Sequence, residues 1–366
     1  MGADRDDGRL LQPGDVIGIL GGGQLGRMLA LAAARLGFDV HIFTPEQKAP
    51  ASRVAAASTI AAYDDLDAVR AFARRCDVIT YEFENVPAAT ALAASEVAPL
   101  RPGARALDVA QDRLTEKRFL KEVGARTVSF CPVDGPQDMT DAAFVVLAGG
   151  AILKTRRMGY DGKGQARYAP GDDPAAAFAA IGEQPAILEA LAPFRRELSI
   201  VAARSLNGDV AAFPLSENTH SDGILRTSLA PAQTDADTVE EAARIARSIL
   251  ESLDYVGVLA VELFQLEDGA LLVNEIAPRV HNTGHWTMDA CACCQFEQHV
   301  RAVAGWALGP SQAHSAAQMT NLIGEDVHRW RDWLARPGAV LHLYGKDEAR
   351  PGRKMGHVNQ LSALEG

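Results

Sequence analysis

The sequence lacks any run of about 18 uninterrupted apolar residues, so no membrane-spanning helix is expected. Its first nine residues are polar and mostly charged, which does not match the apolar core of a secretory signal. We therefore predict a cytoplasmic protein without a membrane partner. Residues 1–12 are expected to form a flexible extension.

Cysteine is scarce, and its number is odd. The five thiols are Cys76, Cys131, Cys291, Cys293 and Cys294. An odd count in a chain of 366 residues does not fit a disulfide framework and favours a reducing compartment. The close spacing of the last three could suggest zinc, but a second ligand pair at suitable spacing is missing. We interpret them as buried or helical thiols.

An excess of basic residues is also missing. Lys and Arg number 36 against 47 Asp and Glu, which gives a formal net charge of −11. This balance argues against a general nucleic-acid-binding surface. It leaves room for a local cationic pocket that binds a phosphorylated small molecule. The length and the hydrophobic content of 48% predict two or three globular domains.

Residues 14–110 alternate between short apolar strands and helical segments, which predicts a doubly wound parallel sheet. The first strand runs into the glycine-rich turn 21–26, which matches G-x-G-x-x-G. A dinucleotide-binding fold would place an acid at the end of the second strand, where the chain has Phe43-Thr44-Pro45, and Glu46 comes late. The turn therefore favours a site near a substrate over a nicotinamide site.

Two glutamates lie on neighbouring apolar segments that a short turn joins. If Asp268-Gly269 form a two-residue hairpin loop, counting outward places Glu262 opposite Glu275. Opposed like charges on one face of a sheet destabilise it, and a hard divalent cation with nucleotide phosphates would compensate. The alternative is that one glutamate is solvated or salt-bridged to Arg279.

The same register raises a question about the residue next to Glu275. Strict alternation sends Asn274 to the opposite face, so a bulge or a strand end is required if Asn274 is to reach a nucleotide. The loop that follows, residues 279–286, gathers polar and cationic groups directly after a buried strand. Loops in this position often carry sites.

Two further segments can be interpreted either as solvent-exposed segments without a specific role or as parts of a phosphate-binding site. The loop 155–165 has three glycines among charged residues, between expected strands at 151–154 and 166–168. It is either a flexible hairpin tip or a lid that closes over a polyphosphate, with Lys154 beneath it. The cations of segment 346–354 are either a solvated charge run or a phosphate clamp.

Together these segments resemble the ATP-grasp superfamily and, more narrowly, the N5-carboxyaminoimidazole ribonucleotide synthases. The matching motifs are Gly22–Met28, Asp112–Lys117, Gly159–Gln165, His220–Ser228, Asn274–Asn282 with Gly284–Trp286, and Arg350–Lys354. The chain departs from the resemblance at Met158, where the family often has another glycine.

The resemblance implies a mixed α/β and α+β architecture, the ATP-grasp fold. The implied parts are the extension 1–12, a Rossmann-like domain at 13–111, a small lid subdomain at 112–192 and a large subdomain at 193–366. The last part would include the segment that binds the substrate phosphate.

The resemblance also implies roles for individual residues. Lys154, Arg279, His281 and Asn282 would be catalytic, the last three where bicarbonate meets the phosphoryl group. Glu262 and Glu275 would bind Mg²⁺. ATP would contact Arg113, Lys154, Gly159, Tyr160, Asp161, Gly162, Lys163, Gly164, Gln165, Glu189, Ala190, Leu191, Ala192, Glu197, His220, Asn274 and Glu275. Substrate would contact Glu82 (or Glu84), Tyr160, Asp161, Lys346 and Arg353.

The implied reaction joins ATP, bicarbonate and 5-aminoimidazole ribonucleotide through carboxyphosphate in purine biosynthesis, and the implied assembly is a homodimer. A formate-dependent glycinamide ribonucleotide transformylase is the alternative within the superfamily. A nicotinamide-dependent oxidoreductase and a noncatalytic nucleotide sensor are the alternatives from other classes.

Overall fold

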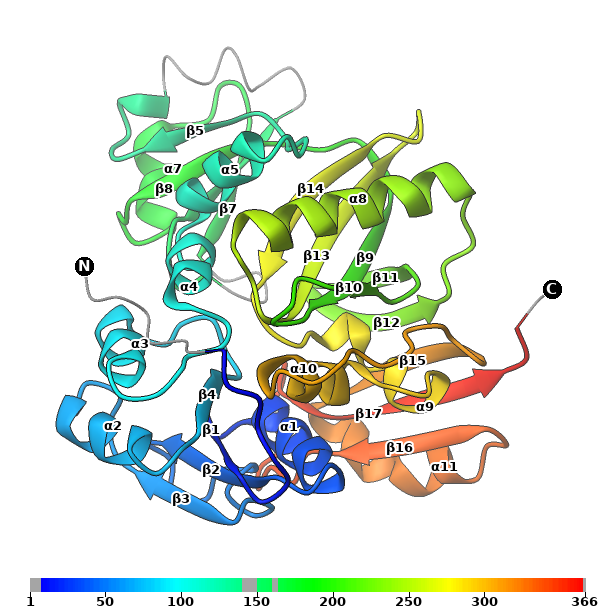
Figure 1. The fold of residues 1–366 in the computed structure, drawn as a ribbon. Helices are drawn as coiled ribbons and strands as arrows, with labels where there is room; N and C mark the ends of the chain where they lie inside the picture. The colour runs from blue at the N-terminus through cyan, green and yellow to red at the C-terminus, as the bar shows by residue number, and fades with distance from the viewer. Residues whose placement is uncertain (1–7, 140–149, 160–163, 365–366) are drawn as a thin grey trace.

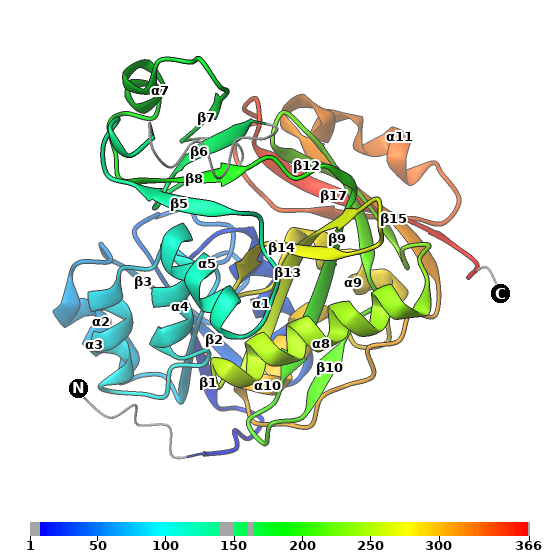
Figure 2. The ribbon, with the colours of Figure 1, turned by 90° about the horizontal axis from the view of Figure 1, so that it is seen from above.

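The computed structural model describes residues 8–139, 150–159 and 164–364, which form three β-sheets with helices packed around them (Figures 1 and 2). The sheets follow one another along the chain, and their strands lie within residues 16–81, 130–190 and 194–362. Within these ranges no helix has the length and apolar character needed to cross a bilayer. The exact domain limits remain a prediction.

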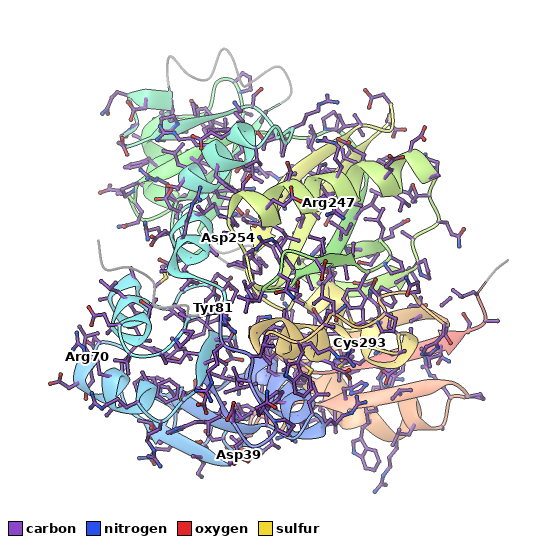
Figure 3. The ribbon with its side chains drawn as sticks, viewed as in Figure 1. Asp39, Arg70, Tyr81, Arg247, Asp254 and Cys293 are labelled. Carbon is purple, nitrogen blue, oxygen red and sulfur yellow. The ribbon has the colours of Figure 1, made fainter. Side chains whose placement is uncertain are left out.

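The first sheet is parallel, with the strand order β3-β2-β1-β4. Its elements are β1 (Val16–Leu20), α1 (Gln24–Arg35), β2 (Asp39–Thr44), β3 (Ala57–Ile60), α2 (Leu66–Ala73), β4 (Val78–Tyr81), α3 (Ala88–Ser95) and α4 (Ala104–Ala110). Leu20 pairs with both Phe43 and Tyr81, so three strands end at one edge. Tyr81 lies in the interior, whereas Asp39 and Arg70 lie at the periphery (Figure 3). The predicted parallel α/β sheet is confirmed.

The second sheet is small and antiparallel, with the order β5-β8-β6-β7. Its elements are α5 (Arg113–Glu122), β5 (Phe130–Val133), β6 (Ala151–Thr155), β7 (Gln165–Tyr168), α7 (Pro174–Ala180) and β8 (Ala186–Ala190). Helix α5 begins where the Asp112 carboxylate accepts the amide hydrogens of Leu114 and Thr115, and the chain turns at Gly124 with φ +79°. Met158 has φ +62°, a conformation that favours glycine.

The third sheet has nine strands in the order β14-β13-β9-β11-β12-β15-β17-β16, and β10 pairs with β9. The strands are β9 (Phe194–Arg204), β10 (Val210–Ala212), β11 (Ser216–Ser221), β12 (Ile224–Ala230), β13 (Gly257–Leu266), β14 (Leu271–Ala277), β15 (Ala316–Ile323), β16 (Ala339–Leu343) and β17 (Lys354–Ser362). The helices are α8 (Ala236–Ser252), η1 (Asn282–Gly284), α9 (Thr287–Ala290), α10 (Gln295–Val303), η2 (Gly324–Arg329) and α11 (Trp330–Leu334).

Alternation along β9 and β13 builds two cores from one sheet. Ile200 and Leu259 pack in the core that contains α8, whereas Val201 and Val258 pack in the core that contains α10 and α1. Helix α10 contacts both the large sheet and α1 of the first domain. The large sheet and the N-terminal domain are therefore held together through α10.

The prediction that residues 1–12 form a flexible extension is wrong at Leu11, which is fixed in place. Leu11 is 1% exposed, and its amide donates to Ala304 while its carbonyl accepts from the Trp306 indole. Residues 1–7 lie outside the described residues. Apolar burial and two hydrogen bonds fix Leu11 against the end of α10, which sequence composition does not reveal.

The glycine-rich turn after β1 surrounds a carboxylate that comes from the end of β4. Glu82 accepts the amide hydrogens of Gly23 and Gly26, at the N-terminus of α1. A Cβ atom at Gly21 would lie 2.8 Å from Oε1 of Glu82, and one at Gly23 would lie equally close. The glycines therefore make room for Glu82, and the carboxylate occupies the place where a dinucleotide phosphate would bind. This geometry disfavours the nicotinamide alternative.

Replacing Gly21 by alanine tests this packing. Gly21 has φ +120°, so alanine adds left-handed backbone strain of about 1–2 kcal/mol and a clash with Glu82 of about 1–3 kcal/mol. Gly14→Ala is the matched control, because Gly14 has φ +96° but no atom within 4 Å of an added Cβ. Urea denaturation should show a clearly larger loss for Gly21→Ala, and equal losses would contradict the placement of Glu82.

Candidate active site

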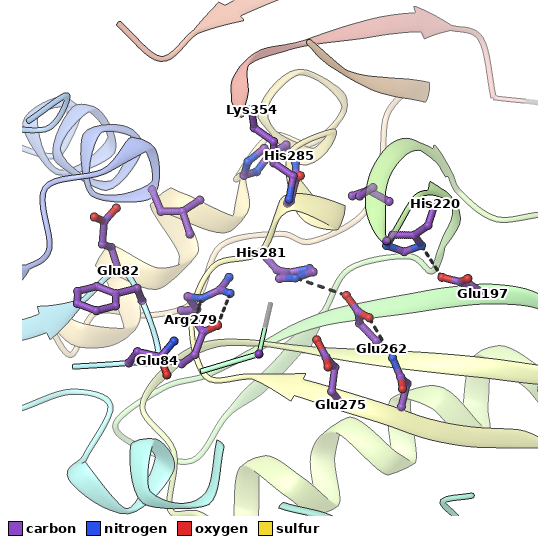
Figure 4. Close-up of a pocket in the computed structure, with 18 of the residues that line it drawn as sticks. Glu82, Glu84, Glu197, His220, Glu262, Glu275, Arg279, His281, His285 and Lys354 are labelled. Atoms are coloured by element: carbon purple, nitrogen blue, oxygen red, sulfur yellow. Dashed lines mark hydrogen bonds and ion pairs between the residues drawn. The ribbon is translucent and has the colours of Figure 1, made fainter. Parts of the chain in front are cut away.

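A cavity of about 640 Å³ lies where the three sheets meet, and its walls are mostly polar (Figure 4). Glu82 and Glu84 come from the N-terminal domain, Lys154 comes from the small sheet, and Glu262 and Glu275 come from the large sheet. The cavity therefore exists because all three parts of the chain contribute to it.

The two glutamates of the hairpin are opposed as predicted, but for a different reason. The turn has three residues, because Leu266 donates to Ala270, and not the two that we expected. One extra residue in β14, Asn274, then shifts the register, and Glu262 again pairs with Glu275. A bulge, one of the two irregularities that would let Asn274 reach the cavity, is present, and the Asn274 amide donates to Glu262 at 3.4 Å.

The opposed carboxylates have different electrostatic surroundings. Burial and the neighbouring Glu275 raise the pKa of Glu262 to about 7. Burial also acts on Glu275, but the Arg113 guanidinium at 2.9 Å outweighs it and lowers the pKa of Glu275. The alternative of a salt bridge to Arg279 is not observed. Arg113, from α5, neutralises one carboxylate of the pair.

A second side chain of α5 holds the bulge itself. The Lys117 ammonium is 1% exposed and donates to the carbonyl oxygen of Asn274 at 2.6 Å. The same ammonium lies 3.5 Å from Glu189 on β8. Lys117 thus connects the bulge of the large sheet with the small sheet.

Glu189 lies between two lysines and does not line the cavity. Its carboxylate is 2.6 Å from the Lys154 ammonium, and its side chain is 4% exposed. Burial would raise the pKa of Glu189, but Lys154 and Lys117 outweigh it and lower that pKa. Lys154 itself lines the cavity. Glu189 therefore orients Lys154 toward the cavity.

On the far side of the cavity, Glu197 of β9 and His220 of β11 form a pair. His220 Nδ1 lies 2.5 Å from a Glu197 carboxylate oxygen. Burial opposes the charged ring, but the adjacent Glu197 carboxylate raises the pKa of His220. Both side chains line the cavity (Figure 4).

The loop after β14 supplies the third wall. Arg279 forms a partly buried ion pair with Glu84, with Nη2 3.1 Å from Oε1. Burial would raise the pKa of Glu84, but Arg279 lowers it to about 2. His281 Nε2 lies 3.5 Å from Glu262, and the Asn282 amide exchanges hydrogen bonds with Asn321. All three predicted catalytic residues of this loop line the cavity.

The basic C-terminal segment reaches the cavity through a residue that we did not predict. Lys354 lines it, whereas Lys346 and Arg353 do not. The Lys346 ammonium donates to the carbonyl of Lys354 at 2.7 Å. Arg353 donates to the carbonyl of Glu348 at 3.0 Å. Lys346 therefore lies just behind the wall.

The structure separates the predicted site residues into three groups. Those that line the cavity are Glu82, Glu84, Arg113, Lys154, Gly159, Gln165, Glu197, His220, Glu262, Asn274, Glu275, Arg279, His281 and Asn282. Those that lie outside its lining are Gly164, Glu189, Ala190, Leu191, Ala192, Lys346 and Arg353. Tyr160, Asp161, Gly162 and Lys163 lie outside the described residues.

Several lining residues were missed by the sequence analysis. They are Gly23, Gln24, Leu25, Phe83, Asn85, Gly223, Leu225, Phe264, His285 and Lys354. Seven of them stand inside motifs that carried the resemblance, so their position in these motifs was a usable signal: Gly23, Gln24, Leu25, Gly223, Leu225, His285 and Lys354. Phe83 and Phe264 gave none, because they lie outside these motifs and do not differ in type from core residues.

Comparisons with known proteins agree with this geometry. Residues 15–111 match the ribonucleotide synthetase preATP-grasp domain, residues 118–296 the ATP-grasp domain, and residues 317–364 the phosphoribosylaminoimidazole carboxylase C-terminal domain. The N5-carboxyaminoimidazole ribonucleotide synthase of Brucella melitensis is 54% identical over 96% of this chain and 97% of its own. The chain belongs to the N5-carboxyaminoimidazole ribonucleotide synthase family.

Solved structures of this synthase family have the same fold. The ADP complex of an N5-carboxyaminoimidazole ribonucleotide synthetase superposes with a TM-score of 0.93 at 39% identity, covering 97% of this chain and 94% of the other. The Aspergillus clavatus synthase in complex with ADP and 5-aminoimidazole ribonucleotide gives 0.89 at 29% identity, covering 96% and 94%. The predicted ATP-grasp fold is confirmed.

Removing Glu189 should show that the pair of lysines depends on it. Glu189→Leu leaves the buried Lys117 ammonium and the partly buried Lys154 ammonium without their carboxylate, and we expect a loss of about 3–5 kcal/mol in the free energy of unfolding. Glu241→Leu is the control, because Glu241 pairs with Arg244 on an exposed helix face and should change stability by about 1 kcal/mol or less. Denaturant titration measures the free energy of unfolding of both variants. Similar losses in the two would contradict the contribution of Glu189 as the partner of Lys117 and Lys154.

Proposed function

We propose that this cavity binds ATP, bicarbonate and 5-aminoimidazole ribonucleotide together and joins them through carboxyphosphate. As a member of its family, the chain is an ATP-dependent ligase that carboxylates 5-aminoimidazole ribonucleotide to N5-carboxyaminoimidazole ribonucleotide in purine biosynthesis. The observation that carries the mechanism is the opposed Glu262–Glu275 pair, in reach of Arg113, in a cavity built by all three sheets. A homodimer and a cytoplasmic location are part of the proposal.

The carboxylate pair fits Mg²⁺. Two opposed carboxylates offer hard oxygen ligands, and the raised pKa of Glu262 reflects a buried negative charge that a divalent cation would stabilise. Among residues 8–139, 150–159 and 164–364, no group of three or more acidic, His or Cys side chains forms a metal site. With the two carboxylates as its protein ligands, the cation would take its remaining ligands from phosphates and water. When bound, the cation neutralises phosphate charge.

The ATP phosphates would lie between Lys154 and the Asn274–Glu275 bulge. Lys154 projects from the small sheet, and Asn274 faces the same cavity from the large sheet. Phosphoryl transfer requires positioning and charge neutralisation, which these groups provide. Glu197 and His220 would hold the ribose side of the nucleotide, and the backbone of residues 189–192 would meet the adenine.

Bicarbonate would bind against the loop that carries Arg279, His281 and Asn282. Attack of a bicarbonate oxygen on the γ-phosphorus of ATP forms carboxyphosphate and releases ADP. The amine of the substrate then attacks the carboxyl carbon of carboxyphosphate and displaces phosphate, or carboxyphosphate first breaks down to phosphate and carbon dioxide and the amine attacks the carbon dioxide. In both routes the amine nitrogen loses a proton as the C–N bond forms. Carboxyphosphate hydrolyses readily, so the loop 159–165 would act by excluding water.

The acceptor would bind between Glu82 and the C-terminal segment. Glu82 is held at the glycine-rich turn, and Lys346 with Lys354 lies near it as a cationic group for a phosphate. Lys354 takes a place in this proposal that the sequence analysis gave to Arg353. Tyr160 and Asp161 are proposed to contact the aminoimidazole.

The decisive experiment measures ADP release with bicarbonate and 5-aminoimidazole ribonucleotide, each present or absent. Glu275→Gln should lower kcat by about 100-fold or more, because it removes a charged ligand of the metal and the partner of Arg113. Glu267→Gln, in the exposed turn of the same hairpin, should retain activity. Near-normal turnover of Glu275→Gln would contradict the proposed role of Glu275 as a metal ligand.

The proposed role of Lys346 predicts a specific pH profile. Burial and the nearby Arg353 lower the pKa of Lys346 to about 8, so its ammonium is charged below pH 8 and neutral above it. Because kcat/KM reports ionisation of the free enzyme, kcat/KM for the ribonucleotide should fall above about pH 8. Lys346→Arg, which stays charged, should remain active to higher pH. A wild-type profile without this decline would contradict a phosphate-binding ammonium at Lys346.

A further inference from the structure

Gln295, the first residue of α10, has its whole side chain buried beneath the bicarbonate end of the cavity. It is 0% exposed. Its Oε1 accepts the amide hydrogen of His281 at 2.9 Å, and its Nε2 donates to the carbonyl of His281 at 2.7 Å. A third contact joins Nε2 to Nδ1 of His285 at 3.0 Å. One side-chain amide thus binds both backbone groups of a cavity residue and the ring of another.

These contacts determine which atom of the glutamine amide is which. The His281 N–H needs an acceptor, so the atom facing it is the oxygen, and the other atom is the NH₂ group. One of its hydrogens goes to the His281 carbonyl and the other to His285. Nδ1 of His285 must therefore accept, and the proton of the neutral ring lies on Nε2.

The surroundings of the amide support this assignment. A Cβ atom at Gly284 would lie 2.7 Å from Oε1 of Gln295, so the loop makes room for the amide at a residue without a side chain. The backbone amide of Gln295 donates to Thr287, whose hydroxyl donates to the carbonyl of Gly284. Burial lowers the pKa of His285 well below its ordinary value, which keeps the ring neutral.

We propose that Gln295 is a positioning residue that fixes the backbone of His281 and holds His285 as the Nε2–H tautomer at the cavity wall. His281 is thereby held with its ring opposite Glu262, and His285 keeps a defined hydrogen-bond donor for an oxyanion of the carbonate class. This inference rests on the proposed function for the identity of the anion. The tautomer itself does not depend on it.

The chain provides a matched control on the same helix. Gln298 is also 0% exposed, and it binds both backbone groups of Gly309 in the same way, with Nε2 donating to the carbonyl at 2.9 Å and Oε1 accepting from the amide at 2.7 Å. Gln298 does not line the cavity. Gln295→Glu and Gln298→Glu therefore make the same isosteric change at two buried glutamines, each of which hydrogen-bonds the backbone N–H and C=O of one residue.

The first measurement is ¹⁵N NMR of the histidine rings in the wild-type enzyme at neutral pH, with His285 assigned by comparison with His285→Gln. The expected result is a neutral ring protonated at Nε2. A ring protonated at Nδ1, or a charged ring, would overturn the proposal. Because this measurement is made on the wild-type enzyme, its outcome does not depend on whether a Gln295 variant folds.

The second measurement compares the two variants. A carboxylate at residue 295 cannot donate to His285, so Gln295→Glu should move the His285 proton to Nδ1 and lower kcat/KM for bicarbonate by about 10- to 100-fold. The KM for ATP should change little. Gln298→Glu should leave both the tautomer and the bicarbonate dependence unchanged, and equal kinetic effects in the two variants would reduce Gln295 to a structural role.

The two proposals fail in different ways. A wild-type enzyme with the Nε2–H tautomer but without bicarbonate-dependent ADP release would refute the proposed function and leave the role of Gln295 in the fold intact. An active enzyme with the Nδ1–H tautomer would refute the present inference alone.

Discussion

The bulge at Asn274 is the constraint on which the active site depends. In a regular strand, Asn274 and Glu275 would face opposite sides of the sheet. The extra residue lets both reach the cavity and brings Glu275 opposite Glu262. A bulge leaves backbone groups without their ladder partners, and the buried Lys117 ammonium binds the carbonyl oxygen of Asn274. A charge from α5 therefore stabilises the irregular geometry that the chemistry requires.

Helix α5 also sets the relation between the two sheets that enclose the proposed nucleotide site. Arg113 reaches Glu275 on the large sheet and the carbonyl of Gly159. Lys117 reaches the bulge and, through Glu189, the cavity-lining Lys154. A shift of α5 would move the groups on both sides of the proposed phosphate position together. Charged side chains at the domain boundary thus serve as positioning elements, although such pairs add little to net stability.

The sequence predicted the opposed glutamates through two errors that cancel. We expected a two-residue turn in a regular hairpin, and the structure has a three-residue turn followed by a bulge, which restores the predicted pairing at Glu262. Periodicity and motifs located the sheets and most of the lining residues. Periodicity and motifs did not identify Gln295, whose side-chain amide connects a helix to a distant loop, and they did not show that Glu189 lies between two lysines. Both arrangements depend on tertiary packing. Leu11 was misjudged for the same reason.

The distribution of charge explains why the metal would bind where it does. Four acids of this region have basic partners: Glu275 has Arg113, Glu84 has Arg279, Glu189 has Lys154, and Glu197 has His220. Glu262 instead faces the Asn274 amide and the ring of His281, whose pKa burial and Arg279 lower well below its usual range. Its negative charge is therefore the least compensated of the five. A divalent cation at the carboxylate pair would supply the missing positive charge, and the phosphates of ATP would bring the negative charge that balances the remainder.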